Sequence, residues 1–294
     1  MAARDPNRRN VLAAALTALG PVCARAAAPA EPYEVEGGQF ASFDGVQLFY
    51  RRVGAGPPAL LLHGLLGDGP RTWFSTGVAQ RLAESGFTVI APDARAHGLS
   101  AAPTAPAAYP KDVQAMDVEA LMRFLGLRSV KLVGYGLGAQ TAVRLMVRGA
   151  AVERAALAGA GERLILQTQR MAALYEDAIR HGRSGPEPTI GVAVQAAIRL
   201  QRLSPAALVA LVRSEVSTPR DTLARIRTPV LAIAGRQDRG VGAPERLAAL
   251  FPDAQAAYTM GSHLQALRDP PFSELVAGFL MARGAASRFE PPPS

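Results

Sequence analysis

Three alternate glycines follow a short apolar run and predict a strand that turns sharply into a helix. The run covers residues 130–133, and the glycines are Gly134, Gly136 and Gly138. In the pattern G-x-S-x-G, such a turn presents a serine hydroxyl, which a histidine can deprotonate while backbone N–H groups bind the oxyanion. Here Gly136 stands at the serine position and tolerates a strained backbone at no steric cost. The spacing therefore predicts the turn that carries a nucleophile, without the hydroxyl.

Other residue types that carry chemistry are sparse. The single cysteine, Cys23, lies near the N-terminus, and the four histidines form no H-x-x-x-H pair, so we expect neither cysteine chemistry nor a metal site. The glycine spacing does not fit a dinucleotide-binding loop, so we expect no cofactor. Ser75 and Ser262 are the alternative hydroxyl nucleophiles. Ser75 is the better of the two, but we expect it to cap a helix that begins near Gly77.

Short apolar runs alternate with helical periods through most of the chain, as in an α/β fold. Asp44-Gly45 between two strand-like runs predicts a hairpin. The strands are expected at 39–43, 46–52, 59–62, 88–91, 155–158, 229–234 and 256–260, and a strand, the glycine turn and a helix together at 130–146. The other helices outside the central insertion are expected at 78–85, 112–125, 243–250 and 272–281.

The alternation of strands and helices stops between residues 162 and 227, where several helical segments follow one another. We interpret 162–227 as a helical cap inserted into a sheet domain formed by 31–161 and 228–284. The proline-rich end, 285–294, is expected to be a disordered tail.

Residues 1–30 have the features of a twin-arginine export signal. Arg8-Arg9 precede an apolar run that ends at Leu19, and small residues follow it. Cleavage between Ala26 and Ala30 would give a periplasmic or secreted protein, whereas a leader that is not a signal would leave the protein in the cytoplasm. The apolar run is too short to span a bilayer, so we expect no stable membrane insertion after cleavage.

Of the formal net charge of +8, three units come from Arg4, Arg8, Arg9 and Arg25 against Asp5 near the N-terminus, which leaves about +5. The arginines of the remainder are scattered along predicted helices. No basic run interleaved with aromatic residues occurs in the sequence. We therefore expect no binding of nucleic acid.

Five motifs in order resemble the α/β-hydrolase family, of esterase-like or lipase-like type, over residues 46–279. They are Leu61-Leu62-His63-Gly64, the turn Asp93-Ala94-Arg95-Ala96-His97-Gly98-Leu99-Ser100, the glycine turn at 134–138, Gly235-Arg236-Gln237-Asp238 and Gly261-Ser262-His263-Leu264. Ala96 departs from the glycine that the family has at its position. The resemblance implies a mostly parallel, eight-stranded sheet flanked by helices, with a small helical cap.

The resemblance also implies roles for individual residues. His263 would be the base, Asp238 would hold its other ring nitrogen, and Gly136 would occupy the nucleophile position. The N–H groups of Leu65 and Leu137 would form the oxyanion hole. His63, Gly64, Trp73 and Tyr135 would line the pocket, together with the two leucine side chains. For His63 and His97, packing within their loops is the main expectation.

Three functions remain open for a histidine and an aspartate without the serine. His263 could activate a water molecule and so hydrolyse a small apolar ester or a related substrate. It could instead act as a general base on the substrate itself, as in the cofactor-free dioxygenases of this fold, or in a lyase-like reaction. The chain could also be a non-catalytic protein that binds a small apolar molecule, similar to the N-myc downstream-regulated proteins.

Overall fold

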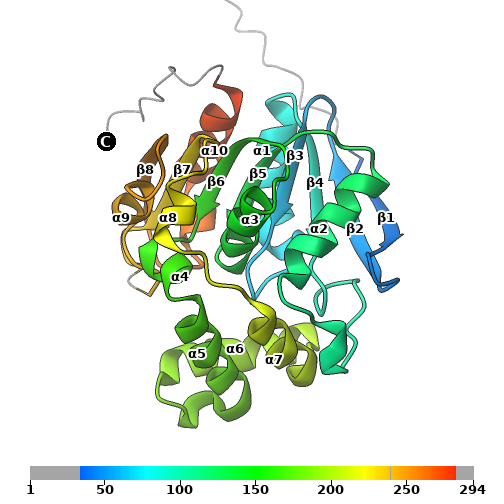
Figure 1. Ribbon diagram of the computed structural model, residues 1–294, viewed down its shortest axis with the longest axis vertical. Coiled ribbons are helices and arrows are strands. Elements are labelled where there is room, and N and C mark those ends of the chain that lie inside the picture. The colour runs from blue at the N-terminus through cyan, green and yellow to red at the C-terminus, as the bar shows by residue number, and fades with distance from the viewer. Residues whose placement is uncertain (1–33, 239, 283–294) are drawn as a thin grey trace, which may run out of the picture. The chain divides into compact units, whose positions relative to one another are not determined.

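The computed structural model describes residues 34–238 and 240–282. The predicted export signal, Cys23 and the predicted tail lie outside these residues. The described residues form an eight-stranded sheet in the order β1-β2-β4-β3-β5-β6-β7-β8 (Figure 1). The strands are β1 (Glu36–Ala41), β2 (Gln47–Val53), β3 (Pro58–Leu62), β4 (Thr88–Asp93), β5 (Val130–Tyr135), β6 (Val152–Ala158), β7 (Val230–Gly235) and β8 (Ala254–Thr259).

The sheet is parallel from β4 to β8, and β2 joins it through antiparallel pairs with β1 and β4. The turn at Asp44-Gly45 connects β1 and β2 as a hairpin, as predicted. The predicted α/β class and the mostly parallel sheet flanked by helices are confirmed.

Helices cover both faces of the sheet because the buried strands are apolar on both sides. Leu60 and Leu62 of β3 pack in one hydrophobic cluster, whereas Ala59 and Leu61 pack in another. This alternation follows from the two-residue period of a strand. The first cluster includes residues of α2 (Val113–Phe124), α3 (Leu137–Val147) and α9 (Pro244–Ala248), and the second includes residues of α1 (Val78–Glu84) and α10 (Pro270–Met281).

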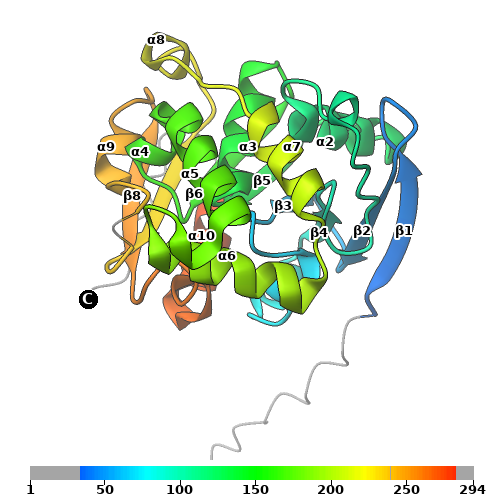
Figure 2. The same cartoon turned by 90° about the horizontal axis from the view of Figure 1, so that it is seen from below.

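Five helices connect β6 to β7 in the segment that we interpreted as a cap. They are α4 (Glu162–Leu166), α5 (Thr168–His181), α6 (Pro188–Gln201), α7 (Pro205–Ser214) and α8 (Arg220–Leu223). Figure 2 shows α5, α6 and α7 lying across one end of the sheet. A third hydrophobic cluster joins cap residues such as Val194 and Leu208 to Leu65 and Leu137. The cap is therefore packed directly on the two loops that were predicted to form the oxyanion hole.

Candidate functional site

The glycine turn has the backbone that its sequence predicts. β5 ends at Tyr135, α3 begins at Leu137, and Gly136 between them has φ 54° and ψ −115°. A Cβ atom on Gly138 would lie 2.0 Å from the carbonyl oxygen of Leu62, and one on Gly134 would lie 2.3 Å from that of Gly138. The outer glycines therefore let α3 start directly against β3 and β5, and Gly136 provides the left-handed residue at the apex.

His263 and Asp238 lie together at the ends of two paired strands. The strands β7 and β8 run side by side in parallel, so the turns that follow them meet at the same edge of the sheet. The Nδ1 atom of His263 is 2.6 Å from Oδ2 of Asp238. The Asp238 carboxylate is 5% exposed, whereas the imidazole is 34% exposed. A carboxylate on Nδ1 fixes this nitrogen as the donor and leaves Nε2 free to accept a proton.

The Nε2 atom of His263 faces the apex of the glycine turn. A Cβ atom built on Gly136 would lie 3.3 Å from Nε2, 3.5 Å from Cε1 of the same ring and 3.9 Å from the Cα atom of Gly64. A hydroxyl oxygen carried by that carbon would be within hydrogen-bonding reach of Nε2. The structure thus brings together Gly136, His263 and Asp238 in the arrangement of a triad whose first member lacks a side chain.

Tyr135 is buried and contacts both the backbone and the ring of His263. It does not line an open pocket, in contrast to our expectation. Its hydroxyl donates a hydrogen bond to the carbonyl oxygen of His263, and the two ring centroids are 5.1 Å apart. Trp73 and Phe272 pack edge-on against the phenol ring. Burial raises the pKa of Tyr135, with a smaller contribution from the negative charge of Asp238. Trp73 and Tyr135 are buried in the hydrophobic cluster on the side of α1 and α10, where their rings pack edge-on against each other.

The residues that carry the predicted oxyanion donors pack against the cap. The side chains of Leu65 and Leu137 are buried in the cluster that includes the cap helices. Within residues 34–238 and 240–282, neither backbone N–H group donates a hydrogen bond to the protein. Leu137 is the first residue of α3, where an N–H group has no partner within the helix. Both groups are thus available to an acceptor on a ligand.

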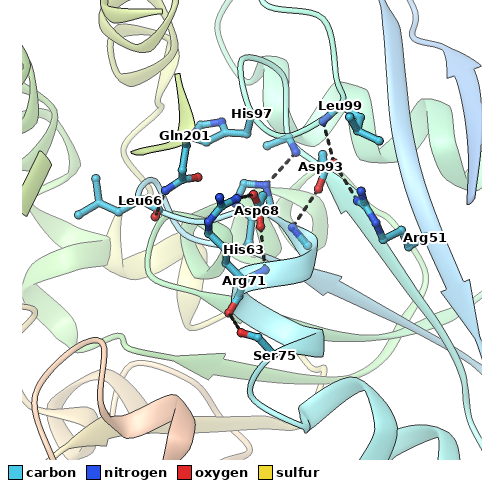
Figure 3. Close-up of polar contacts among 12 residues, drawn as sticks. Arg51, His63, Leu66, Asp68, Arg71, Ser75, Asp93, His97, Leu99 and Gln201 are labelled. Carbon is cyan, nitrogen blue, oxygen red and sulfur yellow. Dashed lines mark hydrogen bonds and ion pairs between the residues drawn. The ribbon is translucent and has the colours of Figure 1, made fainter. Parts of the chain in front are cut away.

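His63 and His97 hold the predicted oxyanion loop in place. The Nε2 atom of His63 accepts from the N–H group of Ala94 at 2.9 Å (Figure 3). The proton of His63 is therefore on Nδ1, which donates to the carbonyl of Gly64 at 2.8 Å. The Nε2 atom of His97 is 2.8 Å from the carbonyl oxygen of Leu65. Burial lowers the pKa of His63 and lowers that of His97 to about 4. Both are neutral packing residues, as we expected, and neither can act as the base.

Further contacts tie the same loop to the core and to the cap. The carboxylate of Asp93 accepts from the N–H groups of Gly69 and Leu99 and pairs with Arg51 at 2.9 Å (Figure 3). Gln201, at the end of α6, donates to the carbonyl of Leu66 at 2.8 Å. The loop is therefore fixed from both sides before any ligand binds, which favours binding of a developing charge without reorganisation.

The alternative serine nucleophiles do not face the base. The hydroxyl of Ser75 donates to the carbonyl of Arg71 at 2.8 Å and is exposed to solvent (Figure 3). The prediction that Ser75 caps the next helix is wrong, because Gly77 is the residue before α1 and no side chain caps that helix. Ser262 is turned toward Gln265, with 3.1 Å between its hydroxyl oxygen and Oε1.

Sequence reasoning missed two residues that lie near the dyad. Gly159 follows β6 with φ 54°, and a Cβ atom there would be 2.9 Å from Cε1 of His263 and 2.7 Å from the ring of Tyr135. A glycine directly after a buried strand was the available signal. Tyr175 of α5 belongs to the cap; burial raises its pKa to about 12, and Asp238 contributes to that shift. No local pattern in the sequence relates Tyr175 to Asp238.

The described residues hold no group of three or more His, Cys, Asp and Glu side chains that could bind a metal ion. No helix in the same part of the chain is long and apolar enough to cross a membrane.

Comparison with known proteins agrees with this geometry. A family model described as "alpha/beta hydrolase fold" matches residues 57–185. An uncharacterized protein of Mycobacterium tuberculosis is 39% identical over 106 residues, which cover 36% of this chain and 29% of that protein. A non-heme haloperoxidase of Rhodococcus erythropolis is 36% identical over 130 residues, which cover 43% of this chain and 45% of that protein. The chain thus matches less than half the length of these curated relatives.

Solved structures extend the likeness over most of the chain. The crystal structure of an esterase from Rhodococcus sp. ECU1013 has a TM-score of 0.65 at 26% identity, covering 84% of this chain and 99% of the esterase. Together with the family model and the sheet order, this likeness shows that the chain has the α/β-hydrolase fold.

Proposed function

We propose that this protein hydrolyses a small apolar ester, or a related substrate, by a water molecule that His263 activates. One observation carries the proposal: the Nε2 atom of His263 faces the apex at Gly136 while Nδ1 is bonded to Asp238 at 2.6 Å. A neutral imidazole oriented by a carboxylate is a general base suited to pH 7. A non-catalytic binding protein has no need of this orientation.

The oxyanion that forms when water attacks the ester carbonyl would be bound by the N–H groups of Leu65 and Leu137. Such donors, aimed at the developing charge, contribute on the order of 10²–10³-fold each to acyl transfer. The apolar side chains of the cluster around Leu65 and Leu137, including Ile179 and Val194, favour an apolar acyl group. When the nucleophile is removed from a triad, the oxyanion hole and substrate binding alone leave about 10³–10⁴-fold acceleration over water, as in subtilisin. We therefore expect a low rate, to which activation of water by His263 adds.

Turnover of a p-nitrophenyl ester by the wild type, His263→Ala and Ser75→Ala tests the proposal. We expect slow turnover by the wild type, a loss of about 10²–10⁴-fold in His263→Ala and no change in Ser75→Ala, because His263 supplies the general base and Ser75 faces away. A fluorophosphonate probe should label Gly136→Ser and leave the wild type unlabelled. Equal turnover by the wild type and His263→Ala would overturn the proposal.

Export of the protein through its first 30 residues remains a separate prediction. Residues 1–30 fused to a folded reporter should carry it into the periplasm, and Arg8→Lys with Arg9→Lys should leave it in the cytoplasm. Equal localisation of the two fusions would contradict the prediction.

A further inference from the structure

An open groove lies on the surface of the molecule between α4, α8 and α9. These three helices lie toward the β8 end of the sheet (Figure 1). The groove has a volume of about 500 Å³, which is within the range of sites that bind small molecules. Two leucines, two arginines and one glutamate are among the residues that line it: Leu166, Leu250, Arg220, Arg246 and Glu162. None of its described lining residues belongs to the candidate site around Gly136 and His263.

The apolar part of the groove is formed by two half-buried leucines. Leu166 of α4 and Leu250, which follows α9, both pack against the hydrophobic cluster that includes α2 and α3. Part of each side chain remains uncovered and lines the groove. Covering such apolar surface stabilises a complex by about 0.8 kcal/mol for each CH₂ group that is buried. This part of the groove therefore favours an apolar chain.

The two arginines of the groove come from different helices and have unused hydrogen-bond donors. Arg220 is the first residue of α8, and Arg246 lies in α9. Within the part of the chain that the structure describes, neither guanidinium donates a hydrogen bond to the protein. The Nη1 atom of Arg246 is 3.7 Å from Oε1 of Glu162, which is longer than a hydrogen bond. Guanidinium groups bind carboxylates through parallel N–H donors, so the groove can hold such a group.

The charge of the groove indicates how much charge its ligand carries. The Oε2 atom of Glu162 accepts from the N–H group of Ala243 at 2.6 Å, which holds this carboxylate in place. Arg220 and Arg246 against Glu162 leave a single excess positive charge among the side chains that line the groove. A ligand with one negative charge balances it, whereas a cation would be repelled.

We propose that this groove is a second binding site and that it takes an amphiphilic carboxylate, in which one carboxylate group is attached to an unbranched apolar chain, as in a medium-chain fatty acid. The carboxylate pairs with Arg220 and Arg246, and the chain lies on Leu166 and Leu250. Binding there is independent of the proposed hydrolysis, because the groove shares no described residue with the candidate site.

The test is an NMR titration of the full-length protein, with isotope-labelled leucine methyl groups, at neutral pH. Octanoate should shift the methyl signals of Leu166 and Leu250 in a saturable way, with a Kd on the order of 0.1–1 mM. Acetate lacks the apolar chain and octylammonium has the opposite charge, so both should leave these signals unshifted at the same concentrations. Octanoate shifts at Leu65 and Leu137 alone would place the ligand in the candidate site and overturn the proposal, as would equal shifts with octylammonium.

Three arginine variants test the polar part of the groove. Arg220→Gln and Arg246→Gln should each weaken octanoate binding by about three- to tenfold, and both residues are exposed, so the fold should persist. Arg236→Gln is the matched control: Arg236 is also exposed, but it lines a neighbouring cavity of about 330 Å³ and not the groove. Its affinity for octanoate should equal that of the wild type. Equal losses in all three variants would show a general effect of net charge and overturn the site, and so would unchanged affinity in both Arg220→Gln and Arg246→Gln.

Discussion

Tyr135 connects the glycine turn to the base through one side chain. It is the last residue of β5, immediately before Gly136, and its hydroxyl donates to the carbonyl of His263. The turn that carries His263 is otherwise partly exposed. A buried phenol that holds the main chain of this turn therefore fixes where the imidazole stands relative to Gly136. We regard Tyr135 as a positioning residue.

At the residue scale, Tyr135→Phe is expected to remove this hydrogen bond and to cost about 1 kcal/mol of the free energy of unfolding. The histidine-dependent kcat should fall by about tenfold or more with little change in KM, because a small displacement of a catalytic group slows the reaction without altering ester binding. Urea unfolding and ester turnover measure the two effects.

Tyr109→Phe is the matched control. Tyr109 is also buried, but its hydroxyl has no hydrogen-bond partner within the described residues. Removing it should leave both stability and turnover unchanged or slightly improve stability. Equal losses in the two variants would contradict a specific role for Tyr135.

The sequence could predict those residues of the candidate site that lie in a recognisable short motif. Gly136, Asp238 and His263 each belong to a short motif at the end of a strand, and parallel strands bring such ends together. The position of Tyr135 could not be predicted in the same way. Its hydroxyl contacts a residue 128 positions further along the chain, and only packing in three dimensions decides whether its ring lines a pocket or enters the core.

At the element scale, the close approach of α3 to β3 depends on Gly138. A Cβ atom there would lie 2.0 Å from a backbone oxygen of Leu62, and backbone atoms in a central strand cannot move aside. Gly138→Ala is therefore expected to cost more than about 3 kcal/mol of the free energy of unfolding or to prevent folding.

Gly126→Ala serves as the control for this prediction. Gly126 follows α2 with φ 64°, and a Cβ atom on it would meet no atom within 4 Å. The variant should lose only about 1–2 kcal/mol, from the left-handed backbone. Thermal unfolding of both variants gives the comparison, and equal losses would show that the contact with Leu62 is not decisive.

A second element-scale feature is the junction where the cap returns to the core after α7. The segment just before α2 makes two hydrogen bonds to this junction. The Nζ atom of Lys111 donates to the carbonyl oxygen of Arg213 at 2.6 Å, and the N–H group of Asp112 donates to the carbonyl oxygen of Ser214 at 3.1 Å. Gln114 donates to the carboxyl of Glu215 at 2.5 Å. Burial raises the pKa of Glu215 to about 7; nearby Asp112 raises it further, while Arg144 and Lys111 oppose the shift.

This raised pKa predicts how stability changes with pH. The folded state binds the Glu215 proton more tightly than the unfolded chain, so Glu215 contributes its full stability below the ordinary pKa of a glutamate. That contribution is lost as pH rises through about 7, by about 3 kcal/mol in total. Glu215→Gln keeps the acceptor for Gln114 and removes the ionisation. The free energy of unfolding of Glu215→Gln minus that of the wild type should therefore be larger at pH 8 than at pH 5.

Urea unfolding of the wild type and Glu215→Gln at pH 5 and pH 8 measures the difference. His97 acts in the opposite direction, because its lowered pKa makes stability fall as pH falls below about 6.5. Its contribution is common to both proteins and cancels in the comparison. A difference that does not change with pH would mean that Glu215 ionises in the folded protein as it does in water.

The sequence predicted the strands of the core well because each is a short apolar run between turn residues. It placed the start of β6 three residues late, at Ala155, because the preceding Glu153 and Arg154 are charged. Strand pairing holds these residues in the sheet, since Arg154 pairs in register with Lys131 of β5. The helices α4–α8 could be anticipated as a group, but their contacts with the core, such as Glu215 with Gln114, require the folded chain.

At the scale of the whole molecule, the cap and the site share one hydrophobic cluster. Leu208 of α7 lies fully buried in the cluster that contains Leu65 and Leu137, whereas Leu82 of α1 lies equally buried in the cluster on the side of α10. Packing of the cap is thereby linked to the position of the two predicted oxyanion donors, while packing around α1 is not.

Leu208→Ala and Leu82→Ala should each cost about 2–5 kcal/mol of the free energy of unfolding, because each removes a fully buried leucine side chain. Under conditions where both variants remain folded, ester turnover should fall more in Leu208→Ala than in Leu82→Ala, because only Leu208 shares a cluster with Leu65 and Leu137. Calorimetry and turnover at a temperature well below both unfolding transitions test this expectation. Equal turnover in the two variants would show that the cap does not act on the site.

The residue at position 136 affects both the stability of the fold and the rate of the reaction. With φ 54°, a glycine holds the apex without strain, whereas a serine in the same backbone would store about 1–3 kcal/mol. Selection for a more robust fold therefore favours glycine, and selection for a faster reaction favours serine. Because Asp238 and His263 remain paired at 2.6 Å, the two outcomes differ by a single substitution. The present chain has the glycine, which favours stability, and a single substitution to serine would give the form that favours reactivity.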